Sequence, residues 1–233
     1  MLYKAKTLKG YTLKSLDGEI GNAREFYFND QTWVIRYLIA DTGAWLIGRQ
    51  VLISPYSLTG VEQENRHIVV NLTKKQIEDS PPLSNDIPVS RHYEEAFFAH
   101  LGVPLDWDAQ MRGPDPWDPH LRSTHDATGH HIHAEDGNIG HVDDFIIDDK
   151  SWTIRYLIIE TGDWWPEKKV LISPQWIARI SWEQSKVFIN LSREAIRQSP
   201  EYMEDSLPTR NYETELHRHY ERQGYWNDKP SVK

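Results

Sequence analysis

Apolar and polar residues alternate with a period of two over several short segments, and this pattern predicts a protein built mainly of β-strands. In residues 33–40 and 152–159, every second position is Trp, Ile or Tyr. These β-branched and aromatic types favour extended backbone over helix. Further strands are expected at 20–28, 51–53, 58–62 and 67–71, and again at 170–172, 177–182 and 187–190.

Tight turns separate these segments. Asp17-Gly18 and Asp136-Gly137 each lie between two apolar runs. Aspartate and glycine tolerate the positive φ that a short hairpin turn requires. We therefore assign structural roles to Asp17, Gly18, Asp136 and Gly137.

The helices are expected to be short and peripheral. Thr73 and Gln76 have the spacing of a capping box, and Pro81 limits that helix to about two turns. Residues 192–200 repeat the pattern, with Ala195 in place of the glutamine.

The chain repeats itself at a spacing of 119 residues. Residues 2–100 align without a gap to residues 121–219, and about a third of the aligned pairs are identical. A repeat of this length predicts two globular copies, because each copy is large enough to bury its own core. We predict one domain at 1–102, a connector rich in Pro, Asp and Trp at 103–119, and a second domain at 120–233.

Each copy is predicted to form a small closed β-barrel. Six short strands joined by tight turns would leave two unpaired sheet edges, and closure removes them. The expected fold class is therefore mainly β, with two tandem small barrels and short peripheral helices, related by internal duplication. The two barrels are expected to pack against each other within the chain, because each copy can match the surface that the other offers. The same match allows a homo-oligomer.

Composition narrows the classes of function. The chain has no cysteine, which excludes disulfides and thiolate metal sites. A net charge of −9 disfavours broad binding to nucleic acid or anionic lipid. No apolar run approaches the roughly 20 residues needed to cross a bilayer, and none follows the basic residues near Met1 as a signal peptide would require. We expect a cytoplasmic protein without a membrane partner.

The pattern resembles the PRC-barrel family. The residues that carry the resemblance are 17–21 with Phe26, 33–39 and 51–55, and in the second copy 136–145, 152–158 and 170–174. The family's barrel is known from the cytoplasmic domain of the photosynthetic reaction-centre H subunit and from a ribosome maturation factor. The resemblance implies a docking or assembly module without catalytic residues or a cofactor.

A histidine cluster offers an alternative function. His125, His130, His131, His133 and His141 fall within 17 residues. On a strand, His131 and His133 would project from one face, and with nearby aspartates they could bind zinc or nickel. The four metal-ligand candidates are His130, His131, His133 and His141. The aligned residues of the first copy are not histidines, which favours a solvated strand over a metal sensor.

Two further residue types are candidates for specific roles. Trp164 and Trp165 are adjacent at a predicted turn, so at least one is hard to bury in the same core. With Trp45, the counterpart of Trp164, they are the candidate partner-binding residues. The structural alternative is that one tryptophan fills its own barrel and the other rests under the connector. Arg36 and Arg155 lie inside apolar strands beside Asp41 and Glu160, which favours structural ion pairs over substrate contacts.

No nucleophile elbow and no glycine-rich phosphate loop occurs in the sequence. The leading hypothesis is a non-enzymatic module that docks an unknown protein partner. A ligand or metal sensor at residues 125–141 is the alternative. An RNA-associated assembly factor is a weaker third hypothesis, since nucleic acid is disfavoured by the charge.

Overall fold

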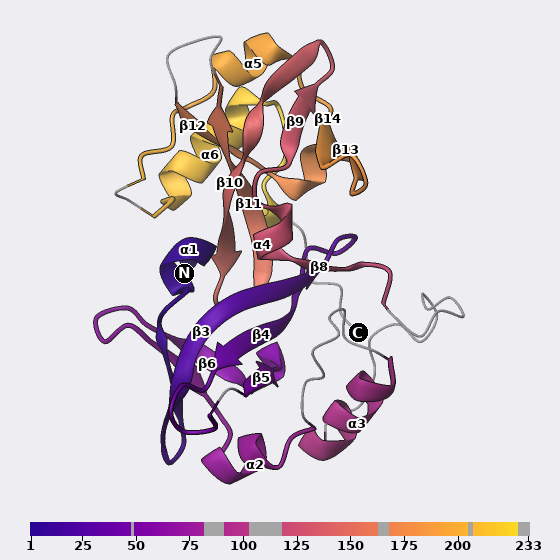
Figure 1. The fold of residues 1–233 in the computed structure, drawn as a ribbon. Coiled ribbons are helices and arrows are strands. Elements are labelled where there is room, and N and C mark those ends of the chain that lie inside the picture. Colours follow the sequence, from indigo (N-terminus) through magenta and orange to yellow (C-terminus); the bar gives the residue numbers. More distant parts are fainter. Residues whose placement is uncertain (48, 82–90, 103–117, 163–167, 205–206, 228–233) are drawn as a thin grey trace. The chain divides into compact units, whose positions relative to one another are not determined.

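The computed structural model describes residues 1–47, 49–81, 91–102, 118–162, 168–204 and 207–227, with side chains throughout except at 91–95 (Figure 1). Within these ranges the chain forms two sheets of seven strands, which confirms the prediction of a mainly β protein. None of the helices described is long and apolar enough to span a membrane.

The first sheet contains β2 (Thr12–Ser15), β3 (Gly18–Asn29), β4 (Ile35–Asp41), β5 (Gln50–Ile53), β6 (Leu58–Glu62), β7 (His67–Val70) and β8 (Leu121–Ser123). The second contains β1 (Leu2–Lys4), β9 (His131–Ala134), β10 (Gly137–Asp148), β11 (Thr153–Thr161), β12 (Lys169–Ile172), β13 (Ile177–Ser181) and β14 (Lys186–Ile189).

The described α-helices are α1 (Ala5–Leu8), α2 (Lys74–Glu78), α3 (Arg91–Leu101), α4 (Thr124–Ala127), α5 (Arg193–Arg197) and α6 (Arg210–His219). Three 3-10 turns accompany them: η1 (Pro55–Ser57), η2 (Pro174–Trp176) and η3 (Tyr225–Asn227). The predicted capping box is present, because Thr73 Oγ1 accepts from Gln76 N and Gln76 Oε1 accepts from Thr73 N. Ser192 caps α5 by accepting from Ala195 N.

The two sheets have the same strand order. It is β5-β4-β3-β2-β7-β6 in the first and β12-β11-β10-β9-β14-β13 in the second. In each, a hairpin joins the sheet through a parallel pair, β2 with β7 or β9 with β14. Among the described strands, no ladder joins the ends of either path, so the hydrogen bonds do not close a barrel as predicted. The prediction assumed short strands only, whereas β3 and β10 each run over 12 residues.

The chain separates into two compact units. Unit 1 is Met1, Ala5–Asp126 and Asp148–Thr153, and unit 2 is Leu2–Lys4, Ala127–Ile147 and Ile154–Lys233. These units differ from the predicted domains at residues 2–4, 120–126 and 148–153. The predicted connector at 103–119 lies mostly outside the described residues. Strand β1 pairs with β10 and belongs to unit 2, while β8 pairs with β3 and belongs to unit 1. Each sheet therefore takes its seventh strand from the other half of the sequence.

Trp33 and Trp152 end turns instead of beginning strands, which corrects the predicted boundaries. Both have positive φ, 60° and 49°, a conformation that is rare for bulky residues. A backbone hydrogen bond of 2.8 Å from Trp33 N to Asn29 O closes the first turn. A backbone hydrogen bond of 2.7 Å from Trp152 N to Asp148 O closes the second. Ring stacking supports the strained backbone, since the Trp33 and Phe28 centroids are 5.2 Å apart.

The two Asp-Gly turns are tied to helices. Asp17 Oδ1 accepts hydrogen bonds from Lys74 N at 2.7 Å and from Ser15 Oγ at 2.9 Å, so it caps the start of α2. The bond from Lys74 N is the main reason that the pKa of Asp17 is lowered. Asp136 Oδ1 accepts from Arg193 N at 2.7 Å in the same way. Gly18 and Gly137 have φ of 140° and 143°, which L side chains rarely adopt.

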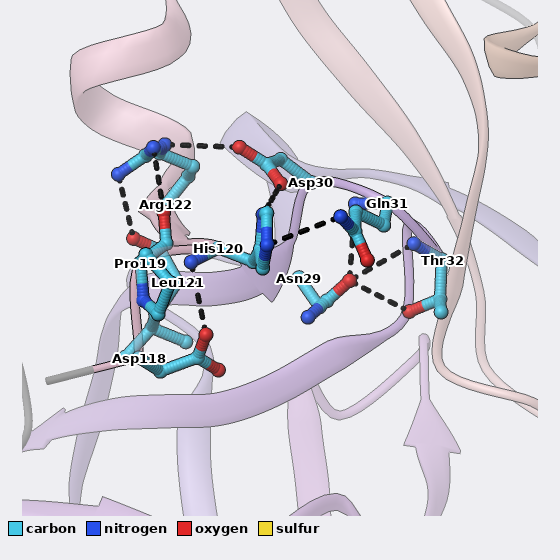
Figure 2. A network of polar contacts seen from close by, with 9 residues as sticks. All are labelled: Asn29, Asp30, Gln31, Thr32, Asp118, Pro119, His120, Leu121 and Arg122. Atoms are coloured by element: carbon cyan, nitrogen blue, oxygen red, sulfur yellow. Dashed lines mark hydrogen bonds and ion pairs between the residues drawn. The ribbon is translucent and has the colours of Figure 1, made fainter. Parts of the chain in front are cut away.

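A polar network fixes β8 to the first sheet (Figure 2). Asp30 Oδ1 lies 2.9 Å from His120 Nδ1, and Asp30 Oδ2 accepts from Arg122 Nε at 3.1 Å. Asp30 N also donates to His120 O at 2.9 Å. Asn29 Oδ1 accepts from Gln31 N and Thr32 N and so holds the turn that presents Asp30. The network aligns β8 so that Leu121 pairs with Asn29.

Leu121 completes the apolar core of unit 1. It is 4% exposed and belongs to a cluster whose other buried members are Tyr27, Tyr37, Ile39, Leu52, Phe97 and Phe98. A residue from the start of the second half is therefore part of the core of the first.

Leu121→Ala should destabilise unit 1 by about 3 kcal/mol, because it removes buried methyl groups and leaves a cavity. Urea unfolding followed by circular dichroism measures the change. Leu16→Ala is the matched control, since Leu16 is 64% exposed, and it should shift stability by less than about 0.5 kcal/mol. Equal effects of the two substitutions would contradict the assignment of Leu121 to the core.

Candidate functional site

The solvent-facing side of the second sheet carries two aligned rows of side chains. Cα pairing places Phe188 of β14 opposite both His133 of β9 and Arg179 of β13. It places Lys186 opposite His131, which in turn pairs with His141 of β10. We call His131, His133, His141, Arg179, Lys186 and Phe188 the histidine face.

Strand alternation produces this face. Ile132 and Val187 are buried in the core, whereas His131 is exposed and His133, Lys186 and Phe188 are partly exposed. Successive side chains of a strand point to opposite sides, so a buried residue between two polar ones leaves both of them outside. The strands β13, β14 and β9 that carry most of the face are neighbours in Figure 1.

The row through Phe188 is a stack of planar groups. The Arg179 guanidinium carbon lies 3.5 Å from the centroid of the Phe188 ring. The His133 ring lies 5.3 Å from the same centroid at an interplanar angle of 28°. A guanidinium over an aromatic face is attracted by the ring quadrupole, and the contact restricts the arginine rotamers. The stack therefore presents a cation and two rings in a fixed arrangement.

Arg179 and Lys186 are the cationic members of the histidine face. Burial lowers the pKa of His133, and the charges of Lys186 and His131 lower it further. His141 Nε2 lies 3.6 Å from Glu160 Oε2, so one acidic group borders the face.

The candidate metal ligands do not converge. His130 is 6% exposed, and its ring packs edge-on to Trp182 at 5.1 Å, whereas His131 and His133 point outward. His125 lies in α4, outside strand β9. In the part of the chain that the structure describes, no three His, Asp or Glu side chains are grouped to hold a metal ion.

A second polar cluster lies inside unit 2. Tyr156, Glu213 and His217 are all 3% exposed or less. The Tyr156 hydroxyl lies 3.0 Å from both Glu213 Oε1 and His217 Nε2. The hydroxyl of Tyr225 donates to Glu213 Oε1 at 2.9 Å, and Arg210 Nη1 lies 3.1 Å from Glu213 Oε2. The buried carboxylate thus has partners on both oxygens.

The tautomer of His217 follows from its two contacts. Nδ1 lies 2.9 Å from the carbonyl oxygen of Gln223, which can only accept, so Nδ1 carries a proton. Burial lowers the pKa of His217, which favours the neutral ring whose Nε2 is an acceptor. One Tyr156 proton therefore faces two acceptors. Burial also raises the pKa of Tyr156, with a further contribution from Glu213.

The remaining candidates occupy varied positions. Trp45 is partly exposed, and Lys74 Nζ lies 5.5 Å from its ring centroid. Trp164 and Trp165 lie outside the described residues, so their role as partner anchors stays a prediction. The guanidinium of Arg155 lies 4.1 Å from the centroid of the Tyr225 ring, a cation–π contact within unit 2. Arg36 borders a cavity of unit 1.

Sequence reasoning missed Arg179, Lys186 and Phe188, as well as Glu213 and His217. The signal for Lys186 and Phe188 was the alternation in 186–189, where they alternate with Val187 and Ile189. The signal for Glu213 and His217 was their spacing, four residues apart on one side of a helix.

Comparison with known proteins gives one family. Residues 132–196 match the PRC-barrel domain. The matched segment runs from β9 to α5 and includes three members of the histidine face from β13 and β14. No curated protein matches the chain.

Glu213→Leu should lower the stability of unit 2 by about 3 kcal/mol, because the hydroxyls of Tyr156 and Tyr225 lose a shared acceptor and Arg210 loses its ion-pair partner. Glu215→Leu, an exposed change on the same helix, is the control and should cost less than about 0.5 kcal/mol. Denaturant midpoints of the two variants give the comparison. A loss from Glu213→Leu no larger than the control would refute the network.

The stability of unit 2 should fall as the pH drops below about 6.5, the pKa of an unfolded histidine. The sign follows from the lowered pKa of His217 in the folded state, because the unfolded chain then binds a proton that the folded chain does not. His217→Phe, the residue type at the aligned Phe98, should flatten this dependence, and His131→Phe should not. Urea midpoints between pH 5 and 8 provide the measurement, and equal slopes for all three proteins would contradict it.

Proposed function

We propose that this chain is a non-enzymatic docking module that binds an acidic surface of a protein partner through the histidine face. We infer with it that the two halves arose by duplication of one PRC-like domain and that the protein acts in the cytoplasm. The observation that carries the proposal is the ordered stack of Arg179 on Phe188 beside His133, on the outer side of a sheet.

The residue types of this stack are those that dominate binding energy in protein interfaces. Arginine and aromatic side chains are enriched in the central residues of interfaces, and most of the energy comes from a few of them. A sheet supports them better than a loop does, since less side-chain freedom is lost on binding. The histidine face therefore has the composition and the rigidity of a docking surface.

The local charge of the histidine face favours an acidic surface on the partner, although the net charge of the chain is negative. The chain as a whole carries −9, so long-range forces repel most acidic proteins. Arg179 and Lys186 concentrate positive charge on one face, and complementary charge sets orientation and association rate. The aligned residues of the first half are Gly60, His67 and Val69 in place of Arg179, Lys186 and Phe188. Docking is therefore assigned to the second sheet.

The ionisable cluster inside unit 2 supports a binding role better than an enzymatic one. Glu213 is hydrogen-bonded by two tyrosines and paired with Arg210, and Tyr156 shares its proton with His217. An ionisable group whose hydrogen bonds are already made within the core stabilises the fold and has little capacity left to bind a substrate.

Arg179→Glu should weaken partner binding at least about tenfold, because it reverses the charge of the cation that stacks on Phe188. The partner is first identified by cross-linking in native cells and mass spectrometry, and binding of the purified pair is then measured by calorimetry at low and moderate salt. Phe188→Ala should weaken binding without altering the salt dependence. Val69→Ala, the aligned change in the first half, should leave affinity unchanged.

Two outcomes would refute this function. One is a cross-linked protein set that is the same for the wild type and Arg179→Glu. The other is a set that disappears on ribonuclease treatment while the purified chain binds RNA, which would point to nucleic acid instead.

A further inference from the structure

A cavity of about 380 Å³ lies in unit 1, and none of its lining residues belongs to the histidine face. Ile35, Pro55 and Trp152 contribute apolar surface to it, and Tyr56, Arg36 and Lys150 add an aromatic ring and two cations. This size and composition are typical of sites for small organic molecules, which combine apolar walls with a few polar groups.

Backbone contacts fix the walls of the cavity. Ile35 N donates to Trp152 O at 2.7 Å, and Val34 pairs with Thr153 as an isolated bridge. The Trp152 ring is 3% exposed and stacks on Phe26 with centroids 6.4 Å apart. Tyr56 is 62% exposed on η1, whose first turn Ser54 caps. The apolar wall is therefore held in place while Tyr56 stands at the rim.

The charged residues that line the cavity indicate the charge of its ligand. Arg36 and Lys150 are its charged members, and no Asp or Glu is among the described residues that line it. A carboxylate can accept charge-assisted hydrogen bonds from an arginine and a lysine, while an apolar body lies against Pro55 and the ring of Tyr56. We propose that this cavity binds a small organic carboxylate with an aromatic or branched apolar body.

The aligned positions in the other half lack these features. Gln175 aligns with Tyr56, and Gln31 aligns with Lys150, so one ring and one charge are missing there. The guanidinium of the aligned Arg155 lies over Tyr225. The combination of an exposed aromatic ring and two cations is specific to unit 1. The proposed ligand site does not depend on the docking function proposed for the second sheet.

The test titrates the full chain with 3-phenylpropanoate and with its uncharged analogue, 3-phenylpropanamide. Calorimetry gives the affinity, and the indole N–H signal of Trp152 in nitrogen-15 spectra, assigned with Trp152→Phe, locates the site. The carboxylate should bind and shift that signal, and the amide should bind about tenfold more weakly because it lacks the charge.

Lys150→Gln should reduce affinity for the carboxylate about fivefold to tenfold and bring it towards that of the amide. Tyr56→Ala should weaken both probes. Gln31→Ala and Arg179→Glu are controls that should change neither. Equal affinity of the two probes, an unchanged affinity in Lys150→Gln, or no shift at Trp152 up to the solubility limit of the carboxylate would each overturn the proposal, whatever the fate of partner docking.

Discussion

The exchange of one strand between the halves of the sequence is the constraint on which the rest of the structure depends. Strand β8 lies against β3 because Asp30 binds His120 and Arg122, and its Leu121 then enters the core of unit 1. Strand β1 joins β10 in unit 2 in the corresponding way. Neither half can complete its sheet alone, since an edge without its partner leaves backbone groups unpaired.

This constraint explains why the chain tolerates strained turns. Trp152 keeps a positive φ, and its residue range 148–153 belongs to unit 1 although its neighbours in sequence belong to unit 2. Strain of this kind persists only where surrounding contacts determine the conformation. The stacking of Trp152 on Phe26 and the bond from Ile35 N to Trp152 O supply those contacts. The same contacts shape the wall of the cavity.

Local features of the fold could be predicted from the sequence, and long-range ones could not. The capping box at Thr73 and the turn at Asp17 depend on neighbouring residues, so spacing alone indicates them. The exchanged strands depend on pairing between distant residues, which are 90 positions apart for Asp30 and His120 and 148 apart for Met1 and Asp149, and no local pattern specifies a partner at that distance. The end of the turn at Trp33 was placed wrongly because aromatic residues favour strands, whereas tertiary stacking holds this one in a left-handed conformation.

In the candidate site, too, local features could be predicted from the sequence and long-range neighbours could not. The histidines of β9 stand out in the sequence, but Arg179 and Phe188 become their neighbours only through the parallel pairing of β9 with β14. His130 shows the opposite error, since its place in the histidine run suggests a ligand, whereas alternation along the chain turns it towards Trp182.

The residues that differ between the halves form the candidate binding sites, whereas the residues that the halves share determine the fold. Gly21 and its counterpart Gly140 are both required, because a Cβ at either position would collide with the backbone of the neighbouring strand. Tyr37 and Tyr156 are also aligned, yet Phe98 stands where unit 2 has His217, so the surroundings of the tyrosine are apolar in unit 1 and include a polar cluster in unit 2. Several residues of the histidine face and of the cavity are replaced at the aligned positions of the other half. Two sheets with one strand order can therefore present different surfaces, because alternation leaves the outward residues of each strand unconstrained by the core.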